Sequence, residues 1–115
     1  MSEVRLKKVE SLLRAEISFL ISRGVIKDPR VPRLAAVTGV EVSRDLQRAK
    51  VFVSFFGSDE QRNSCVEALN HAVGFIHRKL GQSLHLRTIP RPVFVADVSI
   101  ERGVQITRKI RDLFP

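Results

Sequence analysis

The chain has 115 residues, a length that leaves room for one hydrophobic core and so predicts a single domain spanning residues 1–115. Its apolar fraction of 43% and charged fraction of 28% are those of an ordinary globular protein and exclude wholesale disorder. Lysine and arginine outnumber aspartate and glutamate by 20 to 12, for a formal net charge of +8. This excess favours a polyanionic partner, with nucleic acid first and an anionic membrane surface second.

The first predicted element is an amphipathic helix from Val4 to Ile21. Its apolar residues recur at spacings of three and four and predict one buried stripe, made of Val9, Leu12, Leu13, Ile17, Leu20 and Ile21. Gly24 is a natural stop signal, and the prolines of the segment that follows cannot continue a helix, so we expect the helix to end near Arg23. Charged residues interrupt the apolar pattern, which is therefore neither a signal peptide nor a membrane span.

Two β-rich runs follow. Residues Leu34–Ser43 alternate in polarity and predict a strand, and Ala49–Phe56 predict a second one. The polar residues between them predict a loop that joins the two strands into an antiparallel hairpin. Cys65 is the only cysteine, so no intrachain disulfide can form, and we expect a core thiol in a protein of the cytoplasm.

A second helix is predicted to begin at Ser58 or Asp59 and to end at Gly81. Gly74 lies in the middle of its pattern, where glycine costs about 1 kcal/mol relative to alanine. Either a kink or the close approach of another backbone would explain a glycine at this position.

A third strand is predicted over Val93–Ile100, with Pro92 tolerated at its beginning, and a last helix over Ile100–Phe114. The resulting order is α-β-β-α-β-α. Three strands cannot bury both faces, so the first two helices should cover one face of the sheet and leave the other partly open. The sequence therefore predicts a two-layer α+β domain.

Catalytic and metal-binding patterns are missing from the sequence. The three histidines are six and eight residues apart, which is unsuited to a helical zinc pair, and there is no P-loop or dinucleotide fingerprint. Asp97 and Ser99 would share one face of a strand, but they would need a histidine brought close by the fold to form a catalytic site. We therefore expect no enzyme, no metal or other cofactor and no small-molecule substrate.

Positive charge concentrates in residues 61–92, which hold five cations against the single acid Glu67. Within it, Gly74 permits close approach of a phosphate, and His77, Arg78 and Lys79 follow on the same predicted helix. A solvated helix face is the competing explanation. The chain has no tryptophan or tyrosine, so recognition of phosphate and shape should dominate over base stacking.

Two stretches, Val42–Ser54 and Ala72–Ile76 followed by Arg78 and Leu80, resemble the ribosome-binding factor A family, and the likeness extends over nearly the whole chain. The resemblance implies a type II KH-like fold in which a kink at Ala72-Val73-Gly74 replaces the usual GXXG loop. It also implies binding to the free small (30S) ribosomal subunit and its 16S rRNA, support of late rRNA processing and of growth in the cold, and no catalytic activity.

On this basis the RNA-binding candidates combine the basic helix with further cations before and after it. They are Gly74, His77, Arg78, Lys79, Arg87, Arg91, Arg44, Arg48 and Lys50, with Ala72 and Gly74 forming the kink. We expect a monomer that binds no membrane, with ribosomal proteins and an assembly GTPase as further partners by family analogy. The alternative function is a protein-interaction module that docks ribosomal proteins or other assembly factors, with RNA contacts secondary.

Overall fold

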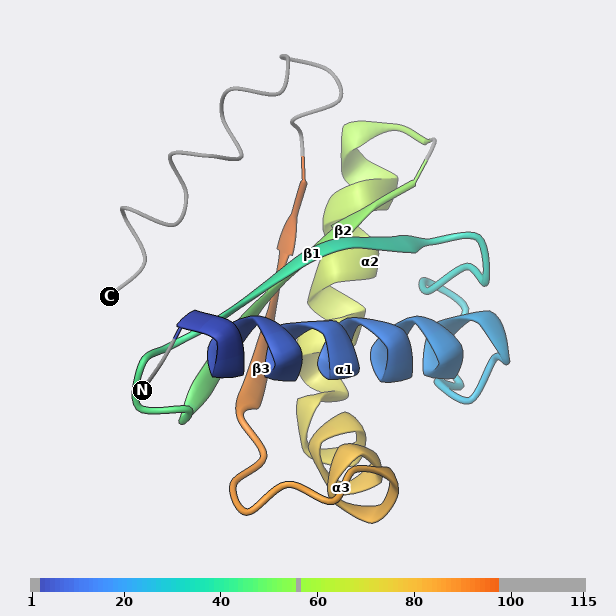
Figure 1. Ribbon diagram of the computed structural model, residues 1–115. Coiled ribbons are helices and arrows are strands. Elements are labelled where there is room, and N and C mark those ends of the chain that lie inside the picture. Colours follow the sequence, from blue (N-terminus) through green and yellow to red (C-terminus); the bar gives the residue numbers. More distant parts are fainter. Residues whose placement is uncertain (1–2, 56, 98–115) are drawn as a thin grey trace.

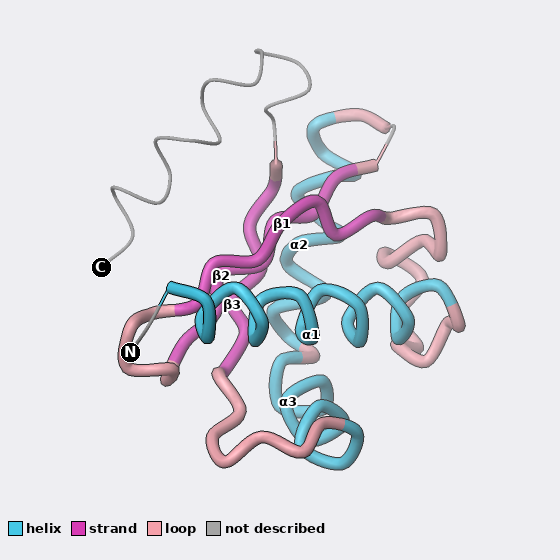
Figure 2. The backbone as a smooth tube through the Cα atoms, viewed as in Figure 1, coloured by secondary structure: helices cyan, strands magenta, loops and turns pink. Residues whose placement is uncertain are grey.

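The computed structural model describes residues 3–55 and 57–97 and places three helices against a three-stranded sheet (Figure 1 and Figure 2). In chain order the elements are α1 (Glu3–Ser22), β1 (Ala36–Val42), β2 (Arg48–Ser54), α2 (Asp59–His71), α3 (Val73–Ser83) and β3 (Arg91–Ala96). The expected helix over residues 100–114, and the end of the expected third strand, lie outside the described residues. Within the described ranges, none of the helices combines the length and the apolar character needed to cross a membrane.

α1 follows the apolar pattern of the sequence except at Leu12, which was expected in the buried stripe but is 37% exposed. Its six buried residues are Leu6, Val9, Leu13, Ile17, Leu20 and Ile21. The predicted stop is also confirmed, because Gly24 adopts a φ of +67°, a left-handed conformation that favours glycine. The Gly24 amide donates to the Ile21 carbonyl at 3.0 Å and the Val25 amide donates to the Leu20 carbonyl at 3.1 Å, which together close the last turn of the helix.

The sheet has β2 at its centre, paired antiparallel with β1 and parallel with β3. The predicted hairpin is therefore confirmed, although both of its strands are shorter than expected. β1 begins at Ala36 rather than Leu34, which is 90% exposed and precedes the strand. β2 ends at Ser54 rather than residue 56. The connecting turn is held by Asp45, whose Oδ1 accepts hydrogen bonds from the Ser43 hydroxyl at 2.7 Å and the Gln47 amide at 3.1 Å.

One face of the sheet packs on the helices. Val51 and Val53 of β2 and Phe94 of β3 are almost fully buried, and they join the buried residues of all three described helices in one core. Their neighbours in sequence point to the opposite face, where Val93 is 45% exposed and Lys50 is half-buried. The expected two-layer arrangement, with helices on one face, is confirmed.

α2 begins with a capping box. The Ser58 hydroxyl accepts from the Gln61 amide at 3.1 Å, and the Gln61 side chain accepts from the Ser58 amide at 2.8 Å. Cys65 is buried in the core as expected, and burial raises the pKa of its thiol. The prediction that Gly81 ends the second helical segment is wrong, because α3 continues to Ser83. An exposed glycine weakens a helix without breaking it.

Asn70 joins α2 to the outer edge of β3. Its side-chain amide donates to the Phe94 carbonyl at 2.9 Å, and its side-chain oxygen accepts from the Phe94 amide at 2.8 Å. The strand lacks a partner on this edge among the described residues, so a side chain here takes the place of a fourth strand. This pair of hydrogen bonds holds the C-terminal part of α2 against β3, directly before the residues where the helix is interrupted.

Candidate nucleic-acid interface

The helical segment between β2 and β3 is interrupted at Ala72. This residue has φ −93° and ψ 7°, it ends α2, and α3 then departs in a different direction (Figure 1). The Ala72 amide still donates to the Ala68 and Leu69 carbonyls at 3.1 and 3.0 Å, so the chain turns without a loop. Within residues 3–55 and 57–97, no side chain caps the beginning of α3. The sequence left open a kink or a close backbone approach as the reason for a glycine at position 74. The structure has a kink in this segment, a helix break at Ala72 two residues before Gly74.

Gly74 lies two residues beyond the break and is exposed. A Cβ atom placed on it would meet no heavy atom within 4 Å, and its φ is not in the left-handed region. The other explanation for this glycine, the close approach of a second backbone within the chain, is therefore not found among the described residues. Neither packing nor backbone strain requires glycine at this position, which leaves its backbone open to a partner from outside.

The three predicted contact residues of α3 differ in what they touch. Arg78 is exposed. Lys79 is half-buried, and its ammonium group lies 5.6 Å from the centre of the Phe75 ring. His77 is half-buried, and its Nε2 donates to the Ile89 carbonyl at 2.8 Å. This hydrogen bond ties α3 to the segment before β3, and it occupies one of the two ring nitrogens that could have faced a phosphate.

The sheet brings together cations that are far apart in sequence. Arg48 at the start of β2 and Arg91 at the start of β3 are register partners, and both are exposed on the face away from the helices. The Arg91 amide donates to the Gln47 carbonyl at 3.0 Å, which holds β3 against the hairpin turn that carries exposed Arg44. The start of β3 and the hairpin turn are neighbours in Figure 1 as well.

Lys50 and Arg87 occupy less similar environments. Lys50 lies on the same face of β2 as Arg48 but is half-buried, and its register partner on β1 is Glu41. An opposite charge at a directly facing position stabilises the pair and makes Lys50 a weaker candidate for phosphate. Arg87 is exposed in the segment between α3 and β3.

Residues 68–96 contain no aspartate or glutamate, and they include four of the candidate cations: Arg78, Lys79, Arg87 and Arg91. The hydrogen bond between His77 and Ile89 holds the segment between α3 and β3 against α3. The register of β2 and β3 places Arg48 beside Arg91. We call the exposed members of this set, Arg78, Arg87, Arg91 and Arg48, the basic band. Its charge, together with the open backbone at the start of α3, suits a chain of phosphates.

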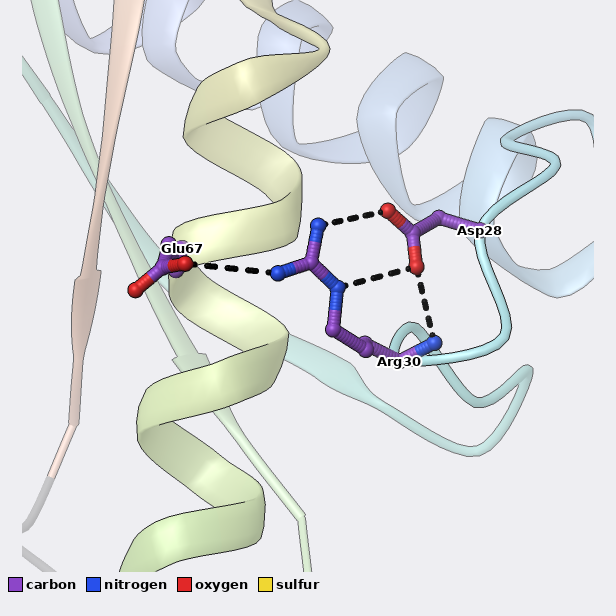
Figure 3. Close-up of polar contacts among 3 residues, drawn as sticks. All are labelled: Asp28, Arg30 and Glu67. Atoms are coloured by element: carbon purple, nitrogen blue, oxygen red, sulfur yellow. Dashed lines mark hydrogen bonds and ion pairs between the residues drawn. The ribbon is translucent and has the colours of Figure 1, made fainter.

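Arg30, which was not among the RNA-binding candidates, forms ion pairs with two acidic side chains. The Arg30 guanidinium donates to both Asp28 oxygens, at 3.1 and 2.9 Å, and to Glu67 of α2 at 3.3 Å (Figure 3). The hydrogen bonds from Arg30 lower the pKa of Asp28 to about 2. The sequence predicted a turn here but contained no sign of this ion pair. It attaches the segment after α1 to α2, and it commits Arg30 to a structural contact.

The catalytic pair considered from the sequence, Asp97 and Ser99, lies partly outside the described residues. Asp97 is buried and accepts a hydrogen bond from the Thr38 hydroxyl, whereas Ser99 is not described. Among the described residues no group of three or more histidine, cysteine or acidic side chains is placed to hold a metal ion.

An α+β fold with a mixed sheet, helices on one face and a helix-break-helix unit between its parallel strands defines a KH-like domain. Residues 5–110 match the family model described as Ribosome-binding factor A. The chain therefore belongs to the ribosome-binding factor A family, which consists of ribosome-binding proteins and not of enzymes.

Individual relatives agree with this assignment. A ribosome-binding factor A from Gloeobacter violaceus is 44% identical over 107 residues, which cover 92% of this chain and 83% of that protein. The crystal structure of ribosome-binding factor A from Thermus thermophilus superposes with a TM-score of 0.67 at 25% identity, covering 79% of this chain and 94% of that one. A Thermus thermophilus homology model, fitted into a cryo-EM map of its 30S complex, shares the fold at a TM-score of 0.55 and 24% identity, with coverages of 76% and 93%.

Proposed function

We propose that the chain binds the free small (30S) ribosomal subunit through its 16S rRNA and supports late processing of that RNA, including during growth in the cold. The observation that carries the proposal is the basic band, three of whose four arginines follow the Ala72 break in a stretch without acids. Family membership supports the partner, because a relative from Thermus thermophilus has been fitted into a map of a 30S complex. A monomer acting in the cytoplasm as a single domain, and released by an assembly GTPase, belongs to the same proposal.

The mode of binding follows from the residues available. The exposed cations neutralise phosphates, and the uncapped start of α3 with Gly74 presents backbone to a phosphate oxygen. Phe75 is partly buried against the core, so it offers no free ring for stacking. Contacts to phosphate position a protein on structured RNA without reading its bases, and affinity should therefore depend on RNA shape and on salt.

Cosedimentation tests the proposal directly. Purified small subunits, large subunits and whole ribosomes are each sedimented with the chain at low and at moderate salt. We expect binding to small subunits alone, and weakening as salt rises, by a log-log slope of about 0.7–0.9 for each phosphate neutralised. If the wild-type chain ignores small subunits at every salt concentration, the proposed function is wrong.

The double variant Arg78→Glu, Lys79→Glu locates the contact. It should reduce affinity for small subunits and make the dependence on salt shallower, because two cations no longer replace counterions. Arg33→Glu is the control for a single Arg78→Glu variant, because Arg33 is also exposed but lies in the segment before β1, outside the basic band. Equal losses from the two single variants would assign the effect to net charge rather than to a contact.

The processing role needs a cellular test. In a strain that lacks the factor, wild-type chain should restore mature 16S rRNA ends and growth at reduced temperature, and the double variant should not. Restoration by the double variant at matched protein levels would show that RNA processing does not depend on Arg78 and Lys79.

A further inference from the structure

α1 has a second apolar stripe on the side that faces away from the core. Val4, Leu12 and Phe19 are 78%, 37% and 49% exposed. Leu12, Ala15 and Phe19 are separated by three and four residues, so they line up along one side of the helix. The packing of α1 is already satisfied by its six buried residues on the opposite side. An isolated exposed apolar residue needs no explanation, but a helical row of them does.

Positive charge surrounds this stripe. The five cations of α1 and its C-terminal end are all exposed: Arg5, Lys7, Lys8, Arg14 and Arg23. Of the three acids of the helix, Glu16 borders the stripe and the other two lie away from it. Glu10 points to the sheet, where its carboxylate accepts from the Val42 amide at 2.9 Å, and Glu16 is half-buried at the margin of the stripe. Glu3 lies in the first turn. The outer face therefore combines exposed apolar side chains with cations, and one of these cations, Lys8, lies in the same row between Val4 and Leu12.

The stripe is also narrow and made partly of small residues. Ser11, Ala15 and Ser22 are exposed beside Leu12 and Phe19. Small side chains allow a second helix to approach closely, as they do wherever helices pack tightly. One face of the Phe19 ring is covered by the Arg23 guanidinium, 5.2 Å from the ring centre. We call this surface, residues 4, 8, 11, 12, 15, 19, 22 and 23, the outer α1 face; α1 lies along the outside of the domain in Figure 1.

We propose that the outer α1 face docks an acidic amphipathic helix of a protein on the small ribosomal subunit. Such a helix would cover Leu12 and Phe19 with apolar side chains and place carboxylates against the flanking cations. RNA supplies the charge but leaves the Leu12 side chain in water, and one face of the Phe19 ring is already covered by Arg23. An anionic membrane would need a wider apolar face than one large apolar residue in about every two helical turns, with serines and Lys8 between them.

The inference rests on the proposed binding to the small subunit, and its test separates protein contacts from RNA contacts. The variant Leu12→Asp, Phe19→Asp is titrated against intact small subunits and against protein-free 16S rRNA. Leu34→Asp is the matched control, because Leu34 is 90% exposed but lies outside the outer α1 face. Ala15→Glu is a second variant that keeps the large residues and favours a helix, so misfolding cannot explain its effect.

We expect both α1 variants to bind intact subunits about tenfold or more weakly than the wild-type chain, with unchanged affinity for protein-free rRNA and unchanged melting temperatures. Leu34→Asp should behave as wild type with both probes. A photoreactive residue at position 11 should then cross-link, in purified subunits, to an acidic helical segment of a ribosomal protein.

Other outcomes overturn the proposal. Equal loss with intact subunits and protein-free rRNA would make the outer α1 face an RNA contact, and no loss with either would remove it from the interface. Binding to phosphatidylglycerol vesicles that is lost in the variants, with subunit binding intact, would assign the face to a membrane. If the wild-type chain binds neither subunits nor rRNA, the proposed function itself is wrong. If the wild-type chain binds normally and the variants bind equally well, only the proposal for the outer α1 face is wrong.

Discussion

Replacing Gly74 with alanine separates the stability of α3 from its function. The added methyl group would contact nothing within 4 Å, and the backbone of Gly74 does not have the positive φ that would strain an alanine. Alanine is favoured over glycine in a helix by about 0.5–1 kcal/mol. The free energy of unfolding should rise by this amount, and for a domain of this size the melting temperature should rise by roughly 2–6 °C. Urea and thermal unfolding measure both quantities.

The same methyl group would stand where we propose that a phosphate meets the backbone. Gly74→Ala should therefore weaken binding to small subunits by about tenfold, equivalent to about 1.4 kcal/mol, although the protein is more stable. Gly81→Ala is a close control, because Gly81 is also exposed in α3 with nothing within 4 Å of its would-be Cβ. It should add stability without reducing affinity. If Gly74→Ala binds as tightly as Gly81→Ala in cosedimentation, the backbone at this position is not a contact.

Three further predictions concern the scaffold. Asn70→Ala should lower the free energy of unfolding by about 1–3 kcal/mol, because two hydrogen bonds to Phe94 are lost; a change below about 0.5 kcal/mol in urea denaturation would mean that water replaces them. Ser58→Ala should cost about 1 kcal/mol, and Ser58→Gly less, since glycine is a tolerated N-cap; equal losses would argue against the capping role. The folded-state pKa of Asp28 is lowered from 3.8 to about 2, so its contribution is complete above about pH 4 and is lost as pH falls toward 2. Asp28→Asn should flatten the pH dependence of the urea midpoint in this window, and an unchanged dependence would show that Arg30 does not hold the carboxylate in solution.

Local patterns were enough to find most of the secondary structure. The apolar spacing of α1, the Gly24 stop, the hairpin and the Ser58 start of α2 all depend on residues within a few positions of one another. The end of α3 was the exception. Gly81 is a common stop signal, but its cost in an exposed helix is small, and contacts of Leu80 in the core outweigh it.

The candidate site was less predictable than the fold. The sequence pointed to Gly74 and Arg78, and the structure shows that both are exposed. It also grouped His77 with them, although His77 donates a hydrogen bond to Ile89, a residue brought near it by the return of the chain to the sheet. Periodicity alone placed Leu12 in the buried stripe of α1, and only the structure shows that Leu12 is exposed on the outer α1 face.

The sequence by itself determined the helices, the hairpin, the cationic stretch and the family. Each of these depends on residues that are close together in the chain or on a motif of fixed spacing. Tertiary structure alone decided that β3 runs parallel to β2, and that Arg91 consequently faces Arg48. It also decided that Arg30 forms ion pairs with Asp28 and Glu67, two residues that the sequence did not connect with it. The strand pairing joins residues that are far apart in the chain, and its register follows from the burial of a whole sheet face rather than from any local preference.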